Sequence, residues 1–148
     1  MNGVVWLKKI VRSAIVPFRS EQMYELVNDI ERYPEFMPGC VAAKIIERGD
    51  DWLEAELELK KAGFQQSFVT RNVLEEGARI SMSLVKGPFK SLVGAWEFAP
   101  LSDSACKVSF WLEFEMSNSL LALAAGKVFE KVASEQVDVI CKRAKQIY

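Results

Sequence analysis

The pattern of apolar residues along the chain changes from alternation to a helical period near residue 117. Before that point, short segments alternate apolar and polar side chains, as strands with one buried face do, and turn-forming residues separate them. Residues 53–59 show this most clearly, because four apolar residues alternate with three acidic ones. The pattern predicts strands at 8–16, 41–48, 52–60, 64–74, 79–86, 92–98 and 108–116.

Helices are expected at two places. After the first strand, Ser20 has a side chain suited to an N-cap, and apolar residues recur at helical spacing up to Ile30. Two prolines in 33–40 then allow at most one further helical turn. From Ser117 or Asn118 to the end, the helical period predicts one helix of about 30 residues, roughly 45 Å long. Its apolar stripe consists of Phe129, Val132, Ala133, Val137, Ile140, Ala144 and Ile147.

The order of these elements predicts an α+β fold. Consecutive strands joined by short turns form an antiparallel sheet, here of six to seven strands, which curves when one face has to be covered. The long C-terminal helix would lie across the concave face. Because one helix is narrower than a wide sheet, we expect a cavity between the two layers. At 148 residues, the chain is expected to form one domain over 1–148.

Composition excludes several classes of site. The chain has no histidine, which excludes Ser-His-Asp and Cys-His pairs, H-E-x-x-H zinc sites and a histidine general base. The three cysteines, Cys40, Cys106 and Cys141, form no C-x-x-C pair, so we expect reduced, buried thiols and no bound metal. A net charge of −1 does not indicate a nucleic acid as the main partner, and we expect no DNA binding.

Apolar runs in the sequence are short. Val4 to Leu7 is too short for a signal peptide or a membrane span, and 120–126 covers only one or two helical turns before Lys127. We therefore expect a soluble, cytoplasmic protein without an integral membrane segment. Transient contact with a membrane surface stays open.

Two motifs resemble a known family. YPEFMPGC at Tyr33–Cys40 resembles the Y-P-x-F-x-P segment of the coenzyme Q-binding, polyketide-cyclase-like START family, and GPFKSLVGAWEF at Gly87–Phe98 resembles its second signature. The layout from Ser13 onward is similar in particular to the bacterial ribosome association toxins of that family. Gly39 stands where mitochondrial relatives often carry tryptophan, which favours the bacterial branch. The resemblance implies a helix-grip fold, with the long helix gripped by the curved sheet.

Three classes of function stay open. The resemblance implies a non-enzymatic protein that needs no cofactor and binds ubiquinone or a related isoprenoid lipid under the C-terminal helix, in support of respiration. The alternative that the resemblance implies is a toxin that binds the large ribosomal subunit and blocks subunit joining and translation. An enzyme of the polyketide-cyclase type is the third class. Its available acid–base residues, which are more typical of solvated charges, are Asp29, Glu31, Tyr33 and Glu35.

Large apolar residues on the predicted inward faces are the candidate ligand contacts, with Trp96 the strongest single one. Gly87-Pro88 is expected to kink the chain, and Gly94 to permit close approach of a neighbouring strand. The full set of candidates is Phe36, Met37, Phe68, Met82, Leu84, Trp96, Phe98, Phe110, Leu112, Phe114, Phe129 and Val132. The basic residues available for ribosomal RNA are Lys8, Lys9, Arg12, Lys86, Lys90, Lys142, Arg143 and Lys145.

Overall fold

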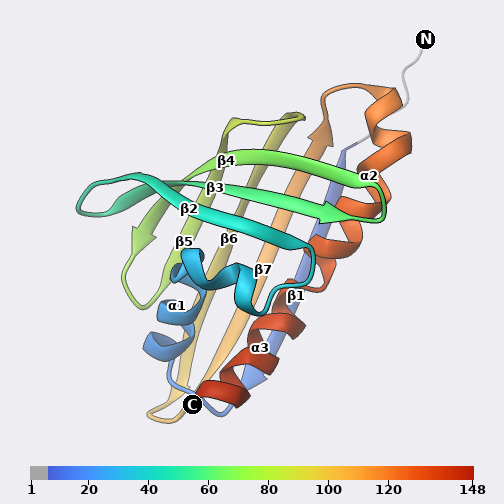
Figure 1. Cartoon of the computed structure of the whole chain (residues 1–148). Helices are drawn as coiled ribbons and strands as arrows, with labels where there is room; N and C mark the ends of the chain where they lie inside the picture. The colour runs from blue at the N-terminus through green and yellow to red at the C-terminus, as the bar shows by residue number, and fades with distance from the viewer. Residues whose placement is uncertain (1–6) are drawn as a thin grey trace.

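Seven antiparallel strands form one curved sheet in the order β1-β7-β6-β5-β4-β3-β2, and helices cover its concave face (Figure 1). The computed structural model describes residues 7–148. The strands are β1 (Lys8–Val16), β2 (Cys40–Arg48), β3 (Trp52–Lys61), β4 (Phe64–Glu75), β5 (Arg79–Lys86), β6 (Phe89–Ser102) and β7 (Ala105–Met116). The helices are α1 (Ser20–Asn28), the 3₁₀ helix η1 (Ile30–Glu35), α2 (Ser119–Ser134) and α3 (Gln136–Ile147). The expected α+β helix-grip fold is confirmed.

The first strand lies beside the last one. β1 pairs with β7 along its whole length, from Lys8 opposite Phe114 to Val16 opposite Cys106. α1 and η1 then carry the chain to the opposite edge of the sheet, where β2 begins the series of hairpins that returns to β7. β1 and β2 are therefore the two edges of the sheet.

Alternation decides which side chains enter the core. In β7, every second residue from Cys106 to Met116 is buried, whereas the residues between them are exposed or half-buried. β3 follows the same rule, with Leu53, Ala55 and Leu59 buried and Leu57 half-buried. The predicted inward faces are confirmed, because a strand that has to bury one apolar face can do so in only one register.

The start of α1 differs from the prediction. Ser20 is the first helical residue and is buried, so it is not the N-cap. Arg19 occupies the capping position, and its backbone N–H donates to Oε1 of Gln22 at 3.0 Å. Gln22 at the third helical position thus supplies the second bond of a capping box, which satisfies the N–H of the capping residue itself.

The expected single C-terminal helix is two helices, α2 and α3, separated at Glu135. Around the break, the Ser134 hydroxyl donates to the carbonyl of Lys131 at 2.9 Å, and the Gln136 side chain donates to the carbonyl of Val132 at 3.0 Å. Such side-chain bonds compete with the helical ladder and bend it. The break lets the two helices follow the curved sheet (Figure 1).

The two ends of the C-terminal helical segment agree with the prediction to different degrees. Asn118 caps α2 as predicted, since its side-chain oxygen accepts from the backbone N–H of Leu121 at 2.7 Å. Ile147, which was assigned to the buried stripe, is 46% exposed.

No helix within residues 7–148 is long and apolar enough to cross a membrane. Residues 4–6 of the N-terminal apolar run lie outside the described residues.

Candidate functional site

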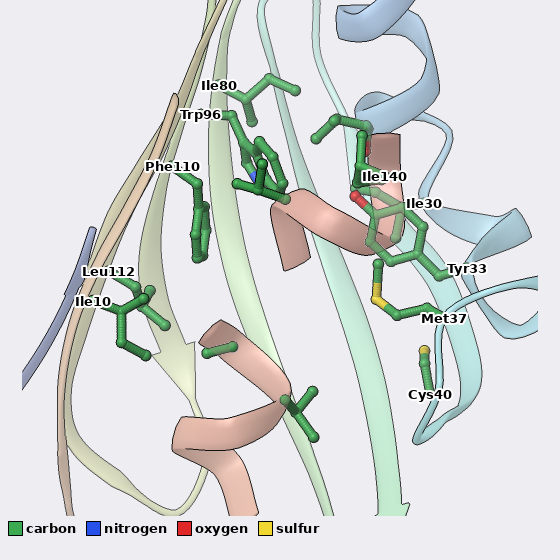
Figure 2. Close-up of a cluster of buried hydrophobic side chains, with 14 of the residues drawn as sticks. Ile10, Ile30, Tyr33, Met37, Cys40, Ile80, Trp96, Phe110, Leu112 and Ile140 are labelled. Carbon is green, nitrogen blue, oxygen red and sulfur yellow. The ribbon is translucent and has the colours of Figure 1, made fainter. Parts of the chain in front are cut away.

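A cavity of about 100 Å³ lies between the sheet and the helices. Trp96, Phe110 and Leu112 point into it from β6 and β7, whereas Tyr33 and Met37 face them from η1 and the residues after it (Figure 2). α2 lines another side, and the cavity is partly open to solvent. The residues that line the cavity are Ile30, Tyr33, Met37, Ala55, Leu57, Leu59, Phe68, Thr70, Asn72, Met82, Leu92, Trp96, Phe110, Leu112, Phe129, Val132, Ala133 and Gln136.

Most of the predicted ligand contacts meet at this cavity. Those that line it are Met37, Phe68, Met82, Trp96, Phe110, Leu112, Phe129 and Val132. They come from the segment after η1, from strands β4 to β7 and from α2, so elements distant in sequence form one apolar wall. Whether this wall binds a ligand stays a prediction.

Four predicted contacts lie elsewhere: Phe36, Leu84, Phe98 and Phe114 do not line the cavity. Phe98 packs edge-on against Tyr24 of α1, with ring centres 5.9 Å apart. Phe114 packs against Phe129 at 4.7 Å, near the other end of β7. Both face inward, but the rings packed against them leave no space for a ligand.

Other lining residues were missed. Ile30 and Tyr33 come from the α1–η1 segment, and Ala55, Leu57 and Leu59 from the inward face of β3. The alternation of apolar and acidic residues in β3 could have identified Ala55, Leu57 and Leu59. The polar residues Thr70 and Asn72 had a signal too, because both are an even number of positions from Phe68 and therefore share its face. Leu92, Ala133 and Gln136 complete the set.

The second motif creates room for an aromatic cluster beside the cavity. At Gly87, a Cβ atom would lie 2.6 Å from Cβ of Phe68, so glycine permits Phe68 to pack there. The Phe68 ring then meets Phe89 at 5.5 Å and Phe129 at 5.9 Å, both edge-on. At Gly94, a Cβ would lie 2.4 Å from the Trp111 carbonyl oxygen. The close approach expected at Gly94 is confirmed.

Side chains of the first motif, Tyr33–Cys40, lie in different surroundings. Tyr33 is buried, and its hydroxyl donates to the backbone carbonyl of Val27, which ties η1 to the end of α1. Burial raises the pKa of Tyr33 above its ordinary range, so the phenol stays protonated. Met37 enters the cavity, whereas Phe36 lies against Arg143 of α3.

The carboxylates considered for catalysis lie outside the cavity. Asp29 and Glu35 form salt bridges with Arg32, at 3.1 and 3.6 Å, and about half of each side chain is exposed. Glu31 accepts a hydrogen bond from the backbone N–H of Ile45 at 3.1 Å, which links η1 to β2. These contacts fit the interpretation as solvated charges at helix ends. In the described cavity wall, Tyr33 is the one ionisable residue.

Three of the candidate basic residues are engaged with carboxylates. Lys9 lies 3.6 Å from Glu113, Lys90 lies 3.6 Å from Glu115, and Arg143 lies 3.2 Å from Glu35. The other five are exposed and form no salt bridge within the described part of the chain: Lys8, Arg12, Lys86, Lys142 and Lys145.

Four of these exposed basic residues lie on strands and helices that contact each other. β1, which carries Lys8 and Arg12, contacts both α2 and α3, and α3 carries Lys142 and Lys145. Figure 1 shows this edge strand running beside the two C-terminal helices. Four exposed cations from the two ends of the sequence thus belong to neighbouring elements.

Comparison with known proteins places the sequence among relatives. The family described as "Polyketide cyclase / dehydrase and lipid transport" matches residues 16–140. The ribosome association toxin RatA of Vibrio cholerae is 47% identical, and the match covers 96% of this chain and 99% of the relative. The mitochondrial coenzyme Q-binding protein COQ10 homolog B of Xenopus laevis is 30% identical, over 92% of this chain and 57% of that protein.

Solved structures share the fold. The crystal structure of the Zhui aromatase/cyclase from Streptomyces sp. R1128 superimposes with a TM-score of 0.83 at 14% sequence identity, covering 95% of this chain and 94% of the other. At that identity the likeness concerns the architecture alone, since one fold supports many unrelated functions.

Proposed function

The chain belongs to the polyketide cyclase / dehydrase and lipid transport family, and on this premise we propose that it is a toxin that associates with the ribosome. It would bind the large subunit and block subunit joining, and so translation. One observation carries the proposal: the relative named a ribosome association toxin is 47% identical over nearly the full length of both chains.

The distribution of charge is compatible with this role. Binding to RNA depends on cations that neutralise phosphates. The formal net charge of −1 does not supply a general attraction, so a local surface has to. We assign this role to Lys8 and Arg12 on β1 and Lys142 and Lys145 on α3, four exposed residues on two elements that contact each other. We name this group the β1–α3 basic side.

The test is sedimentation of the purified full chain with separated ribosomal subunits through a sucrose gradient. We expect the protein in the large-subunit fraction and a loss of joined ribosomes when small subunits are added. A chain that stays at the top of the gradient at physiological salt, and that leaves subunit joining intact, would contradict the proposal.

A second candidate function is binding of a hydrophobic ligand, ubiquinone or a related isoprenoid lipid. The apolar cavity and the coenzyme Q-binding relative support it. Size sets a condition, however. Ligand pockets usually measure about 300–1,000 Å³, and this cavity is about 100 Å³. A compact apolar group fits this scale, whereas a whole isoprenoid chain requires the helices to move.

Matched variants separate the two functions. Ala133 on α2 lines the cavity, so Ala133→Leu places three additional carbons in it and should abolish ligand binding. Ala124 is exposed on the same helix, which makes Ala124→Leu the control. If ribosome association survives Ala133→Leu while ligand binding is lost, the two activities are independent.

Mass spectrometry of organic extracts of the purified wild type identifies any co-purifying lipid.

The polyketide-cyclase type of enzyme has the weakest support. Among the described cavity residues, only Tyr33 ionises, and its hydroxyl already donates to the Val27 carbonyl. The likeness to an aromatase/cyclase concerns the fold. A catalytic role would therefore need a phenol that is held protonated by burial.

A further inference from the structure

The apolar cavity contains a buried polar pair. Thr70 and Asn72 lie on the inward face of β4 and are only 9% and 5% exposed. Their partners across the sheet are apolar: Ala55 and Leu84 for Thr70, and Leu53 and Met82 for Asn72. A polar group is rarely buried among apolar neighbours unless a hydrogen bond satisfies it.

The pair is satisfied on one side only. The Thr70 hydroxyl donates to Oδ1 of Asn72 at 2.9 Å. This bond uses one lone pair of the amide oxygen, and in this arrangement Nδ2 is turned away from the Thr70 hydroxyl. An asparagine also carries two N–H donors on Nδ2. Among residues 7–148 no hydrogen bond from Nδ2 is found, and this atom is not one of the fully buried polar atoms without a partner, so it is reached from the cavity that the side chain lines.

We propose that the Asn72 amide donates to a carbonyl oxygen of a compact, otherwise apolar ligand held in this cavity. The inference rests on the second candidate function and specifies its ligand class. Apolar pockets use a few well-placed polar groups to orient their ligands. Thr70 is a positioning residue, because its bond to Oδ1 leaves the N–H groups as the part of the amide that meets the ligand.

The size of the cavity narrows the ligand class. An apolar cavity of about 150 Å³ holds benzene, and this one is about 100 Å³. The fitting group is therefore a single small ring or a short branched chain with a carbonyl. Met37 and Met82 line the wall, and their flexible side chains can adjust to such a guest.

Two probes of nearly equal shape, both smaller than benzene, test the proposal: cyclobutanone, which has a carbonyl, and methylenecyclobutane, which has a carbon–carbon double bond in its place. Each is titrated into the ¹⁵N-labelled full chain and followed by NMR. We expect cyclobutanone to shift the side-chain amide resonance of Asn72 further than methylenecyclobutane does. After correction for transfer of each probe from water to alkane, the ketone should bind about tenfold more tightly, the effect of one hydrogen bond.

Two substitutions complete the test. Asn72→Leu should bind both probes and lose the tenfold preference for the ketone. Leu53→Met, at the position opposite Asn72 in β3 and outside the cavity wall, is the matched control and should keep it. Thr70→Val should reduce the preference, because the amide is no longer oriented.

The outcomes are distinguishable. If the wild type binds both probes with no preference and no shift of the Asn72 resonance, the inference is wrong while the cavity remains a ligand site. A preference that persists in Asn72→Leu overturns it as well. If neither probe binds, the inference is wrong as well, whereas the second candidate function is decided separately by mass spectrometry of the organic extracts. The wild-type spectra decide the question even if Asn72→Leu does not fold.

Discussion

The guanidinium of Arg143 lies 5.0 Å from the centre of the Phe36 ring, and its Nη2 lies 3.2 Å from Oε1 of Glu35. These residues are more than a hundred positions apart in the sequence. The contact fastens α3 to the segment that follows η1. The same contact explains why Phe36 does not enter the cavity. Its ring lies against the Arg143 side chain, whereas the adjacent Met37 points into the cavity.

Arg143→Ala should therefore loosen α3. A cation–π contact contributes about 0.5–1 kcal/mol and a partly exposed ion pair about 0.2–1 kcal/mol, so we expect a loss of about 1 kcal/mol in the free energy of unfolding. The loss stays small because Nε of Arg143 is buried without a partner among the described residues, and removing it relieves that burial. Urea denaturation measures the change. Lys142→Ala, exposed on the same helix, should change stability by under about 0.5 kcal/mol.

Two glycines should respond in opposite directions to alanine. At Gly94, the new Cβ would meet backbone atoms of β7, with Leu112 Cα at 3.2 Å and the Trp111 oxygen still closer. Separating two paired strands makes Gly94→Ala destabilising by about 2–3 kcal/mol. At Gly126 in α2, nothing lies within 4 Å, so Gly126→Ala should stabilise by up to about 1 kcal/mol through helix propensity. Equal effects in thermal denaturation would contradict the geometry.

The strands could be predicted from the sequence because alternation is a local property. A period of two over 53–59 or 108–116 fixes both the element and its inward face. The break at Glu135 could not be predicted, because the apolar stripe continues across it from Val132 to Val137. What interrupts the helix is a pair of side-chain hydrogen bonds, and their geometry exists only in the folded chain.

The site could be predicted only in part for a related reason. Alternation shows that Phe98, Trp96 and Phe114 face inward, but it does not show how far along a strand the cavity extends. That depends on which rings from other elements fill each end: Tyr24 packs against Phe98, and Phe129 against Phe114. How far the cavity extends along a strand thus depends on tertiary packing, whereas the face to which a side chain points follows from the local sequence.

Ala62 has an unfavourable backbone conformation. It forms a two-residue hairpin turn with Gly63 between β3 and β4, and its φ of 50° lies in the left-handed region. Alanine disfavours that region by about 1–2 kcal/mol, whereas Asn-Gly is the preferred pair for such turns. We expect Ala62→Asn to raise the midpoint of urea denaturation by the equivalent of about 0.5–1 kcal/mol. Ala62→Val should lower it, and a gain with valine would refute the explanation.

The stability of the fold should fall at alkaline pH. Burial raises the pKa of the Cys40 thiol from 9.0 to about 11. Between these values the unfolded chain releases the proton and the folded chain retains it, so the folded state binds more protons. The contribution of Cys40 to stability is therefore complete below pH 9 and is lost as the pH rises towards 11. Denaturation midpoints at pH 8 and pH 10.5 should differ less in Cys40→Ala than in the wild type.

Tyr33 acts in the same direction as Cys40, because its pKa is raised by burial as well. Part of the alkaline loss should consequently remain in Cys40→Ala. Identical losses in the variant and the wild type would mean that the Cys40 thiol titrates alike in both states.

The ribosome proposal makes a prediction about charge position. Replacing Lys142 and Lys145 with glutamate reverses two charges on the β1–α3 basic side. Lys44→Glu with Lys60→Glu makes the same change in net charge on β2 and β3, at the opposite edge of the sheet, and is the matched control. All four lysines are exposed, so neither pair should alter folding much.

Binding through phosphates should distinguish the two pairs. Each phosphate contact makes affinity more dependent on salt, and losing two cations should reduce the slope of log affinity against log salt by about 1–2. We expect the α3 pair to weaken large-subunit binding about tenfold or more at 0.1 M salt, where charges act over about 10 Å. The control pair should stay near the wild-type affinity, since its charges lie at the far edge. If both pairs weaken binding equally, only net charge matters, and the β1–α3 basic side is not the ribosome-binding surface.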